Sequence, residues 1–207
     1  MITDVDKISE FVARLSKQAV DDSVVTNMYS GNDPGNKLRA LNLKHYLNYF
    51  VKNPPYLILV GEAPGYKGCR VSGIPFTSTN LINSSGFFRS IGITDSEYLQ
   101  NEATATIIWS YLNRIKKYPL LWNAFPFHPH DEGVKASNRK PNKSELKTGK
   151  LYLLEIMRLF PSADVIAVGN VAQEALKSVG VTAKCVRHPS RGGKQEFIAG
   201  LEKHLAT

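Results

Sequence analysis

Four separate segments of the chain carry groups that could bind and transform a small ligand. The first is a short loop whose five members are Gly61, Glu62, Ala63, Pro64 and Gly65. Its glycines let the backbone approach a ligand closely, and its amide N–H groups could bind an oxyanion. An ordinary turn between a strand and a helix has the same composition, so the loop needs support from the other segments.

The other three segments offer a flat apolar ring, a paired donor and acceptor, and an imidazole. Phe76 could stack on a planar ligand, and Asn123 carries a carbonyl acceptor beside an amide donor. His188 could donate a hydrogen bond to a leaving group. Each residue also has a plain structural explanation, as a core phenylalanine, a residue that closes a strand and a structural histidine before proline. The fold must therefore show whether they meet.

Short apolar runs predict the strands that would position these segments. We expect strands at residues 56–60, 119–124, 164–169 and 184–187. In open parallel sheets, ligands bind beyond the carboxyl ends of the strands. The loop 61–65, Asn123 and the segment 188–193 all fall at such ends. We therefore expect them to share one crevice.

Helical periodicity separates these strands. We expect helices around residues 107–115, 153–160, 172–179 and 194–205, with Asn170 as the N-cap of the third and Gly180 just past its end. The alternation predicts an α/β fold, a three-layer α/β/α arrangement around a central, mostly parallel four-stranded sheet. We expect one domain over residues 1–207, in which a helical N-terminal region, residues 1–53, packs on the rest.

Composition narrows the class of protein. The 207 residues are 43% hydrophobic, enough for one sizeable core. The sequence has no long apolar run and no secretory leader, so we expect a cytoplasmic monomer that does not enter a membrane. Two cysteines, Cys69 and Cys185, are too few for a four-cysteine site. We expect free thiols and neither a metal nor another cofactor.

The net charge of +8, together with the places where the basic residues cluster, indicates a polyanionic partner. Basic residues crowd two segments that flank the candidate site, namely Lys135, Arg139, Lys140, Lys143, Lys147 and Lys150 in one, and Lys184, Arg187, Arg191 and Lys194 in the other. Clustering of this kind is what a surface that tracks phosphates requires.

In their order along the chain, these segments resemble the motifs of the uracil-DNA glycosylase superfamily. The loop 61–65 is similar to its first motif, above all in the iron–sulfur type, which carries the same Gly-Glu-Ala-Pro-Gly. The further similarities are Gly73-Ile74-Pro75-Phe76 to the base-stacking segment, Asn123 to the base-reading asparagine, Asn138-Arg139-Lys140-Pro141 to a downstream Asn-Arg-Thr-Pro, and His188-Pro189-Ser190 to the second major motif. The resemblance spans roughly residues 56–205. It implies a monofunctional DNA glycosylase of base excision repair that removes uracil or a related deaminated base.

The resemblance also implies a role for each residue. Phe76 would stack on the flipped base, and Asn123 would pair with the N3–H and O4 of uracil, which cytosine does not offer. His188, with N–H groups of the Glu62 loop, would stabilise negative charge on the leaving base. The base pocket would be lined by Gly61, Ala63, Pro64 and Gly65. The DNA contacts would come from Ser190, Arg191, Gly192, Arg139 and Lys140.

The resemblance breaks at two places. The cluster cysteines of the iron–sulfur type are missing, and the N-terminal region could take over their structural task. The water-activating acid is missing as well, because Ala63 stands where the best-known enzymes have Asp, and residues 66–70 contain no carboxylate. Glu62 is then our first choice for positioning water and Asp131 the second. Gly65 replaces a tyrosine that excludes thymine, so the pocket could accept 5-substituted uracils or hypoxanthine unless Tyr66 takes over this task.

Other interpretations stay open. His128, His130 and Asp131 form a poor metal site without a fourth ligand, and we expect a loop that faces DNA. The chain could be a glycosylase-fold module that binds nucleic acid or damaged bases with weak or no cleavage. It could also be an unrelated α/β enzyme acting on a nucleotide or small ester, in which case Phe76, Asn123 and His188 would not meet. Strand preference, for single- or double-stranded DNA, is left open.

Overall fold

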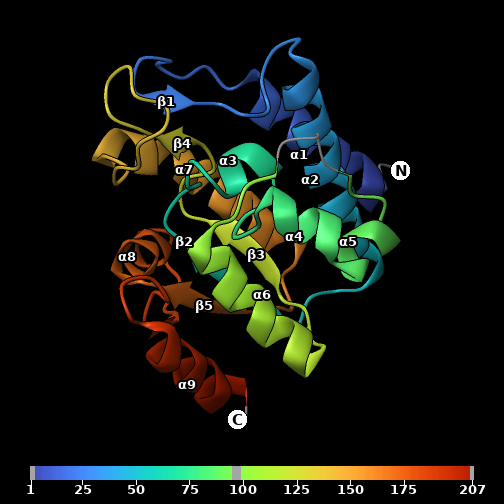
Figure 1. The fold of residues 1–207 in the computed structure, drawn as a ribbon, viewed down its shortest axis with the longest axis vertical. Helices are drawn as coiled ribbons and strands as arrows, with labels where there is room; N and C mark the ends of the chain where they lie inside the picture. Colours follow the sequence, from blue (N-terminus) through green and yellow to red (C-terminus); the bar gives the residue numbers. More distant parts are fainter. Residues whose placement is uncertain (1–2, 95–98, 206–207) are drawn as a thin grey trace.

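The computed structural model describes residues 3–94 and 99–205, and its centre is a parallel sheet between two layers of helices (Figure 1). The sheet has four strands in the order β3-β2-β5-β6. These are β2 (Leu57–Gly61), β3 (Leu120–Asn123), β5 (Asp164–Val168) and β6 (Lys184–Val186). All neighbouring strands pair in parallel. The predicted α/β fold is confirmed, and each strand lies within two residues of its expected place.

The burial of the strands follows their sequences. Every residue of β2 and β3 is buried, which suits two continuous apolar runs. β5 begins at exposed Asp164 and becomes buried toward Val168, and β6 begins at exposed Lys184. The carboxyl ends of the strands are therefore their buried ends, and the site segments start from fixed positions.

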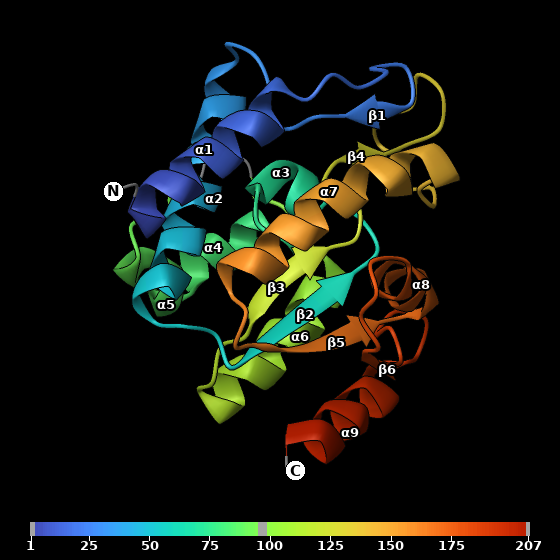
Figure 2. The same cartoon turned by 180° about the vertical axis from the view of Figure 1, so that it is seen from behind.

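Helices cover both faces of the sheet. α6 (Ala103–Ile115) lies over one face in Figure 1, and α7 (Lys143–Leu159) lies over the other in Figure 2. α8 (Asn170–Ser178) packs beside α7, and α9 (Lys194–Leu205) packs against β6. The predicted N-cap of α8 is wrong by one residue. Gly169, with a φ of +88°, occupies the cap without a side-chain bond, and Asn170 is already helical.

The N-terminal region shares the core of the sheet. It consists of α1 (Asp4–Lys17) and α2 (Pro34–Lys52). The apolar stripe of α1 is fully buried, and the ring centroid of Phe11 lies 5.6 Å from that of Trp122 in β3. The hydroxyl of Tyr46, in α2, accepts a hydrogen bond of 2.8 Å from the N–H of Leu121. These contacts tie the region directly to the strand that ends in Asn123.

Several short elements escaped prediction because they are too brief to show periodicity. They are α3 (Cys69–Ser72), α4 (Thr79–Ser84), α5 (Gly86–Ser90) and an antiparallel pair of two-residue strands, β1 (Val25–Thr26) and β4 (His128–Pro129). α3 to α5 lie between β2 and α6 in the chain and carry the segment that ends in Phe76. No helix in the described part of the chain could cross a membrane.

Candidate active site

Gly61, Phe76 and Asn123 meet at the carboxyl end of the two central strands. Gly61 of β2 pairs with Asn123 of β3. A Cβ placed on Gly61 would lie 2.8 Å from Cε2 of Phe76, still closer to its Cζ, and 3.0 Å from Oδ1 of Asn123. The phenyl ring therefore lies on a surface that only glycine leaves open. Phe76 and Asn123, two of the expected pocket walls, therefore meet above Gly61, although they are 47 positions apart in the sequence.

The side-chain amide of Asn123 has no partner of its own. The residue is 3% exposed, and its side chain makes no hydrogen bond within the described residues. Its amide atoms are not among the fully buried side-chain atoms that lack a partner there, so the amide keeps contact with solvent and is open to a ligand. A ligand that offers one donor and one acceptor would satisfy it.

Phe76 is held in a strained backbone conformation. Its φ of +53° lies in the left-handed region, which costs a residue with a side chain about 1–3 kcal/mol. The indole N–H of Trp109 donates to the Phe76 carbonyl at 3.1 Å. The hydroxyl of Ser72 donates to the carbonyls of Ile74 and Thr77 at 3.1 and 2.7 Å. The turn is therefore fixed by buried polar side chains that sequence analysis did not single out.

The N-terminal region supports the same turn. The Tyr29 hydroxyl donates to the carbonyl of Gly73 at 2.9 Å, inside the protein. Gly73 has a φ of +78°, and a Cβ there would lie 2.8 Å from the Arg39 carbonyl of α2. The N-terminal region therefore supports the segment that ends in Phe76.

The loop 61–65 is anchored through its carbonyl groups. The Gly61 carbonyl accepts from Ala124 N–H at 2.8 Å, and the Glu62 carbonyl accepts from Phe125 N–H at 3.0 Å. The carbonyl of buried Pro64 lies 2.7 Å from Nδ1 of His128. The N–H groups of Ala63 and Gly65 donate to no acceptor within the described residues. These two amides are free to bind a negative charge.

Glu62 is the carboxylate of this loop. It is half-buried, and burial raises the pKa of its carboxyl above the usual value, while the charge of Lys140 acts in the opposite direction. Asp131, the second acid considered, is exposed on the hairpin beyond β4. Unlike Asp131, Glu62 belongs to the loop that carries the free amides, and its side chain is less exposed to solvent.

His188 stands two residues beyond β6, next to Gly169 at the end of β5. A Cβ on Gly169 would lie 3.6 Å from the Cβ of His188. The backbone N–H of Ser190 donates to Nδ1 of His188 at 3.2 Å, which makes Nδ1 an acceptor. Burial, helped by the charge of Arg187, lowers the pKa of the imidazole. The neutral ring then carries its proton on Nε2, which has no partner among the described residues.

The loop after His188 combines strain with exposure. Arg191 has a φ of +51°, and Gly192 has a φ of +81°, and both are exposed. Ser190 is half-buried, and its hydroxyl lies 2.8 Å from Nδ1 of His188. Arg191 is therefore presented to solvent from a turn that starts at the candidate catalytic histidine.

Comparison with known proteins decides the family. The model of the uracil DNA glycosylase superfamily matches residues 48–203. The chain belongs to this superfamily. Among solved structures, it is similar to the crystal structure of wild-type SMUG2 from Pedobacter heparinus, with 15% sequence identity and a TM-score of 0.69, over 100% of this chain and 98% of that chain. No curated protein sequence matches the chain. The predicted superfamily is confirmed, and membership supports a hydrolase of the glycosylase type.

In this member of the uracil DNA glycosylase superfamily, Arg139 is bound within the protein. All three nitrogens of its guanidinium bond to the protein, including Glu145 at 2.8 and 2.6 Å and the carbonyls of His130 and Val24 at 2.9 Å. The guanidinium therefore fastens β1 and β4 to α7, and the DNA contact that we predicted for Arg139 stays a prediction. Lys140 is exposed and stays a predicted DNA contact.

The prediction of a loop that faces DNA at residues 128–131 is wrong for its two histidines. His128 and His130 are 0% exposed and lie against the antiparallel pair of β1 and β4. Both ring nitrogens of His128 lie within hydrogen-bonding distance of carbonyl groups, Nδ1 near Pro64 and Nε2 near Lys135. Within residues 3–94 and 99–205, no group of three or more His, Cys, Asp or Glu could hold a metal ion. Cys69 and Cys185 are free, as predicted.

Proposed function

We propose that the protein is a DNA glycosylase that flips uracil or a related deaminated base out of DNA and hydrolyses its N-glycosidic bond. The observation that carries the proposal is the unpartnered amide of Asn123, which lies beside the ring of Phe76 and keeps contact with solvent, in a chain of this superfamily. A ring to stack on and an amide that reads one donor and one acceptor are what a base pocket requires.

The order of the strands supports a base between Asn123 and His188. β3 and β6 are the two outer strands, with β2 and β5 between them. Three strand spacings of about 4.8 Å separate their backbones by about 14 Å, which leaves room for a base between two side chains. Gly61 ends β2 and Gly169 follows β5. The ring of Phe76 occupies the space above Gly61, where it would lie against the bound base.

The chemistry follows from the protonation states. As the bond between C1′ and the base nitrogen breaks, electrons move onto the base, and the Nε2–H of neutral His188 would donate to the charged oxygen. The free amides of Ala63 and Gly65 would add to this stabilisation. The Glu62 carboxylate would orient water toward the cationic sugar carbon and accept its proton. The products are an abasic site and the free base.

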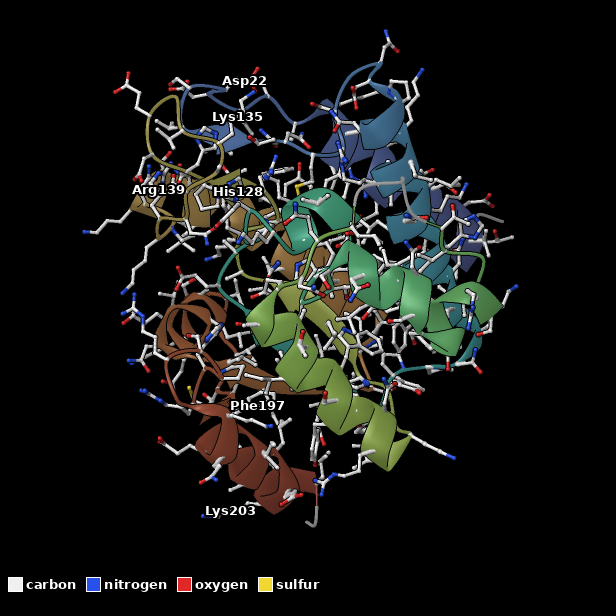
Figure 3. All side chains as sticks on the ribbon, in the orientation of Figure 1. Asp22, His128, Lys135, Arg139, Phe197 and Lys203 are labelled. Atoms are coloured by element: carbon white, nitrogen blue, oxygen red, sulfur yellow. The ribbon has the colours of Figure 1, made fainter. Side chains whose placement is uncertain are left out.

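Incubation with DNA that contains one modified base tests the proposal. Single- and double-stranded oligonucleotides with uracil, hypoxanthine or a 5-substituted uracil are treated with the protein and then with alkali, which cuts at abasic sites. We expect cleavage of at least one of them, and a loss of about 100-fold or more in Asn123→Ala and His188→Ala. Asp22→Asn is the matched control and should keep its rate, because Asp22 is an exposed acid between α1 and β1 with no role in the proposed site (Figure 3).

A module that binds damaged bases without cleavage is the second candidate, and the absence of an acid at Ala63 favours it. Tight, base-dependent binding without any alkali-labile product from the full panel would support the module and exclude the glycosylase. Cleavage that survives in both Asn123→Ala and His188→Ala would show that neither residue forms the site.

A further inference from the structure

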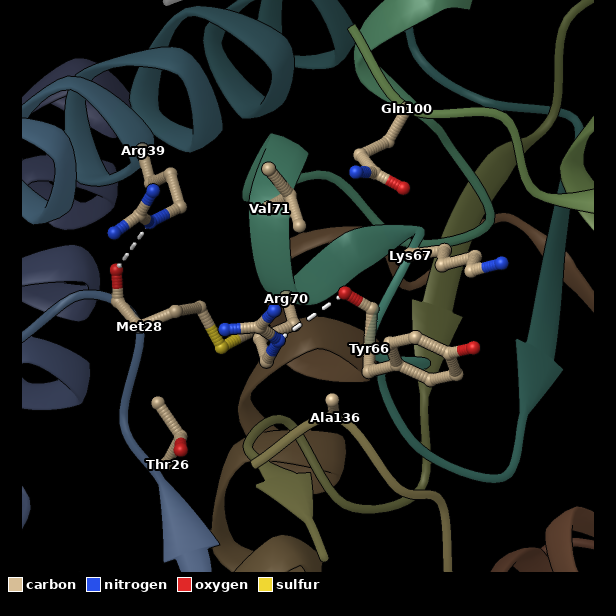
Figure 4. A pocket seen from close by; sticks show the side chains of 9 residues that line it. All are labelled: Thr26, Met28, Arg39, Tyr66, Lys67, Arg70, Val71, Gln100 and Ala136. Atoms are coloured by element: carbon tan, nitrogen blue, oxygen red, sulfur yellow. Dashed lines mark hydrogen bonds between the residues drawn. The ribbon is translucent and has the colours of Figure 1, made fainter. Parts of the chain in front are cut away.

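A cavity begins directly after the loop 61–65 in the chain, and none of the predicted pocket residues lines it. Its volume is about 450 Å³. Figure 4 shows its wall, which is built from the N-terminal region, α3 and the segments around two later loops: Thr26, Met28, Arg39, Tyr66, Lys67, Arg70, Val71, Gln100 and Ala136. The volume falls within the roughly 300–1,000 Å³ of pockets that hold small ligands. Tyr66 and Lys67, which line the cavity, follow Gly65 directly, so the loop 61–65 of the candidate site leads into its wall.

The guanidinium of Arg70 points into this cavity with most of its donors unused. Its Nε donates to the Tyr66 carbonyl at 3.1 Å, whereas its two terminal nitrogens bond to no group in the described part of the chain. The residue is half-buried, and burial lowers the pKa of the guanidinium, with no carboxylate acting against it. No described residue that lines the cavity is acidic. An anion would stabilise this half-buried charge, and the planar guanidinium can bind a phosphate through two parallel N–H groups.

Other groups that face the cavity also lack partners. The Thr26 hydroxyl is buried and makes no hydrogen bond. The side-chain amide of Gln100 and the ammonium of Lys67 have no hydrogen-bonding partner among the described residues, and Lys67 lies 5.4 Å from the centre of the Tyr66 ring. Arg39 differs, because Asp33 lies 3.8 Å away and the Met28 carbonyl accepts from its Nε at 3.1 Å. The unused donors are therefore concentrated around Arg70.

We propose that this cavity binds one phosphate-bearing nucleotide of the substrate strand, outside the base pocket. Arg70 would hold the phosphate through its two terminal nitrogens, the Thr26 hydroxyl would donate a further bond, and the Tyr66 ring would provide a face for the neighbouring base. The inference rests on the proposed function in one respect, which is that DNA is the partner. The continuous segment from Gly61 to Val71 would place this nucleotide close to the flipped one.

A scan of the DNA backbone tests the proposal directly. The full-length protein is titrated with a fluorescent strand of unmodified DNA, and with copies in which one phosphate at a time is replaced by an uncharged methylphosphonate. We expect Arg70→Gln to weaken binding about tenfold and to lower the slope of log Kd against log salt by roughly 0.7–0.9. In strands that carry uracil, one methylphosphonate near it should cause the same loss in the parent and none in Arg70→Gln.

Two further variants separate binding from folding. Thr26→Val removes a buried hydroxyl without a partner, so it should raise or preserve stability and yet weaken DNA binding, a pair of effects that a structural role would not produce. Arg89→Gln is the matched control, because Arg89 is exposed on α5 and makes no hydrogen bond or ion pair among the described residues. It removes the same charge and should leave the methylphosphonate pattern unchanged.

The outcomes distinguish the source of the phosphate. Calorimetry with inorganic phosphate and with a deoxynucleoside monophosphate is run on the parent and on Arg70→Gln. If the free nucleotide binds through Arg70 and no methylphosphonate matters, the occupant is a small molecule and the proposal is overturned. It is also overturned if Arg70→Gln binds every strand as the parent does. An Arg70-dependent phosphate in a protein that cleaves no modified base would refute the proposed function alone.

Discussion

Replacing Gly61 by alanine should test whether the ring of Phe76 truly fills the space above this residue. The new Cβ would lie 2.8 Å from Cε2 of Phe76 and 3.0 Å from Oδ1 of Asn123. Since carbon atoms pack at about 3.5–4.0 Å, the ring must retreat by roughly 1 Å. It cannot retreat freely, because the Phe76 carbonyl is bound by Trp109 and its backbone is already strained.

The magnitude follows from two opposing effects. Overpacking of a core costs about 1–3 kcal/mol, and the loss of freedom in the unfolded chain returns about 0.4–1 kcal/mol. We expect Gly61→Ala to lower the free energy of unfolding by roughly 1–2 kcal/mol in urea titrations. Glycosylase activity should fall by at least tenfold, since the displaced ring and amide are the proposed walls of the base pocket.

Two companion variants make the test decisive. Gly65→Ala, in the same loop, would bring its Cβ no closer than 3.9 Å to Oδ1 of Asn138, so its stability should match or exceed that of the parent. In Gly61→Ala combined with Phe76→Ala, the ring that causes the clash is gone. The losses of stability in the single variants Gly61→Ala and Phe76→Ala should then sum to about 1–2 kcal/mol more than the loss in the double variant. Strictly additive losses would refute the contact between ring and glycine.

Three other perturbations have definite outcomes. Gly149→Ala would drive a Cβ against the Ala124 carbonyl and within 3.0 Å of Phe125 Cα, so chemical denaturation should show a loss of about 1–3 kcal/mol; an unchanged midpoint would contradict this packing. Arg139→Gln should cost about 1.5–3 kcal/mol of stability and leave the salt slope of DNA binding unchanged, whereas Lys140→Gln should lower that slope by about 0.9; the reverse pattern would identify Arg139 as a phosphate contact. Because burial raises the pKa of Glu62 and its ionised form is the proposed base, kcat/KM should fall as the pH drops through a value above 4.5. Lys140→Gln should move this acidic fall of kcat/KM to higher pH, and Glu62→Gln should abolish it. If the fall persists in Glu62→Gln, it belongs to another group.

The strands could be predicted because their apolar runs are continuous. β2 and β3 are buried at every residue, and residues 57–60 and 120–122 are all apolar, so no polar position interrupts either run before its end. The order of motifs was also sufficient to identify the superfamily, because three of the five motifs lie at strand ends, at Gly61, Asn123 and His188. The small elements α3 to α5 were missed, since four to six residues complete barely one turn and show no period.

Basic residues show what such prediction cannot decide. Arg139 lies in a basic segment and in a family-like motif, yet Glu145, six positions away, captures it through two hydrogen bonds. Arg70 stands in an unremarkable stretch, yet its terminal nitrogens remain unpaired beside a cavity. Charge is visible in a sequence, but the acceptor that satisfies a charge depends on chain segments that only folding brings together.

By itself, the sequence determined the class of fold, the superfamily and the strand ends where Gly61, Asn123 and His188 had to lie, because hydrophobic periodicity and motif order are local properties. The tertiary structure decided which of these groups are free to act. It placed the ring of Phe76 on Gly61, left the Asn123 amide without a partner, and fixed the His188 proton on Nε2 through the Ser190 N–H. It also buried His128 and left the two terminal nitrogens of Arg70 without a partner among the described residues, because burial and hydrogen bonding depend on residues distant in the chain.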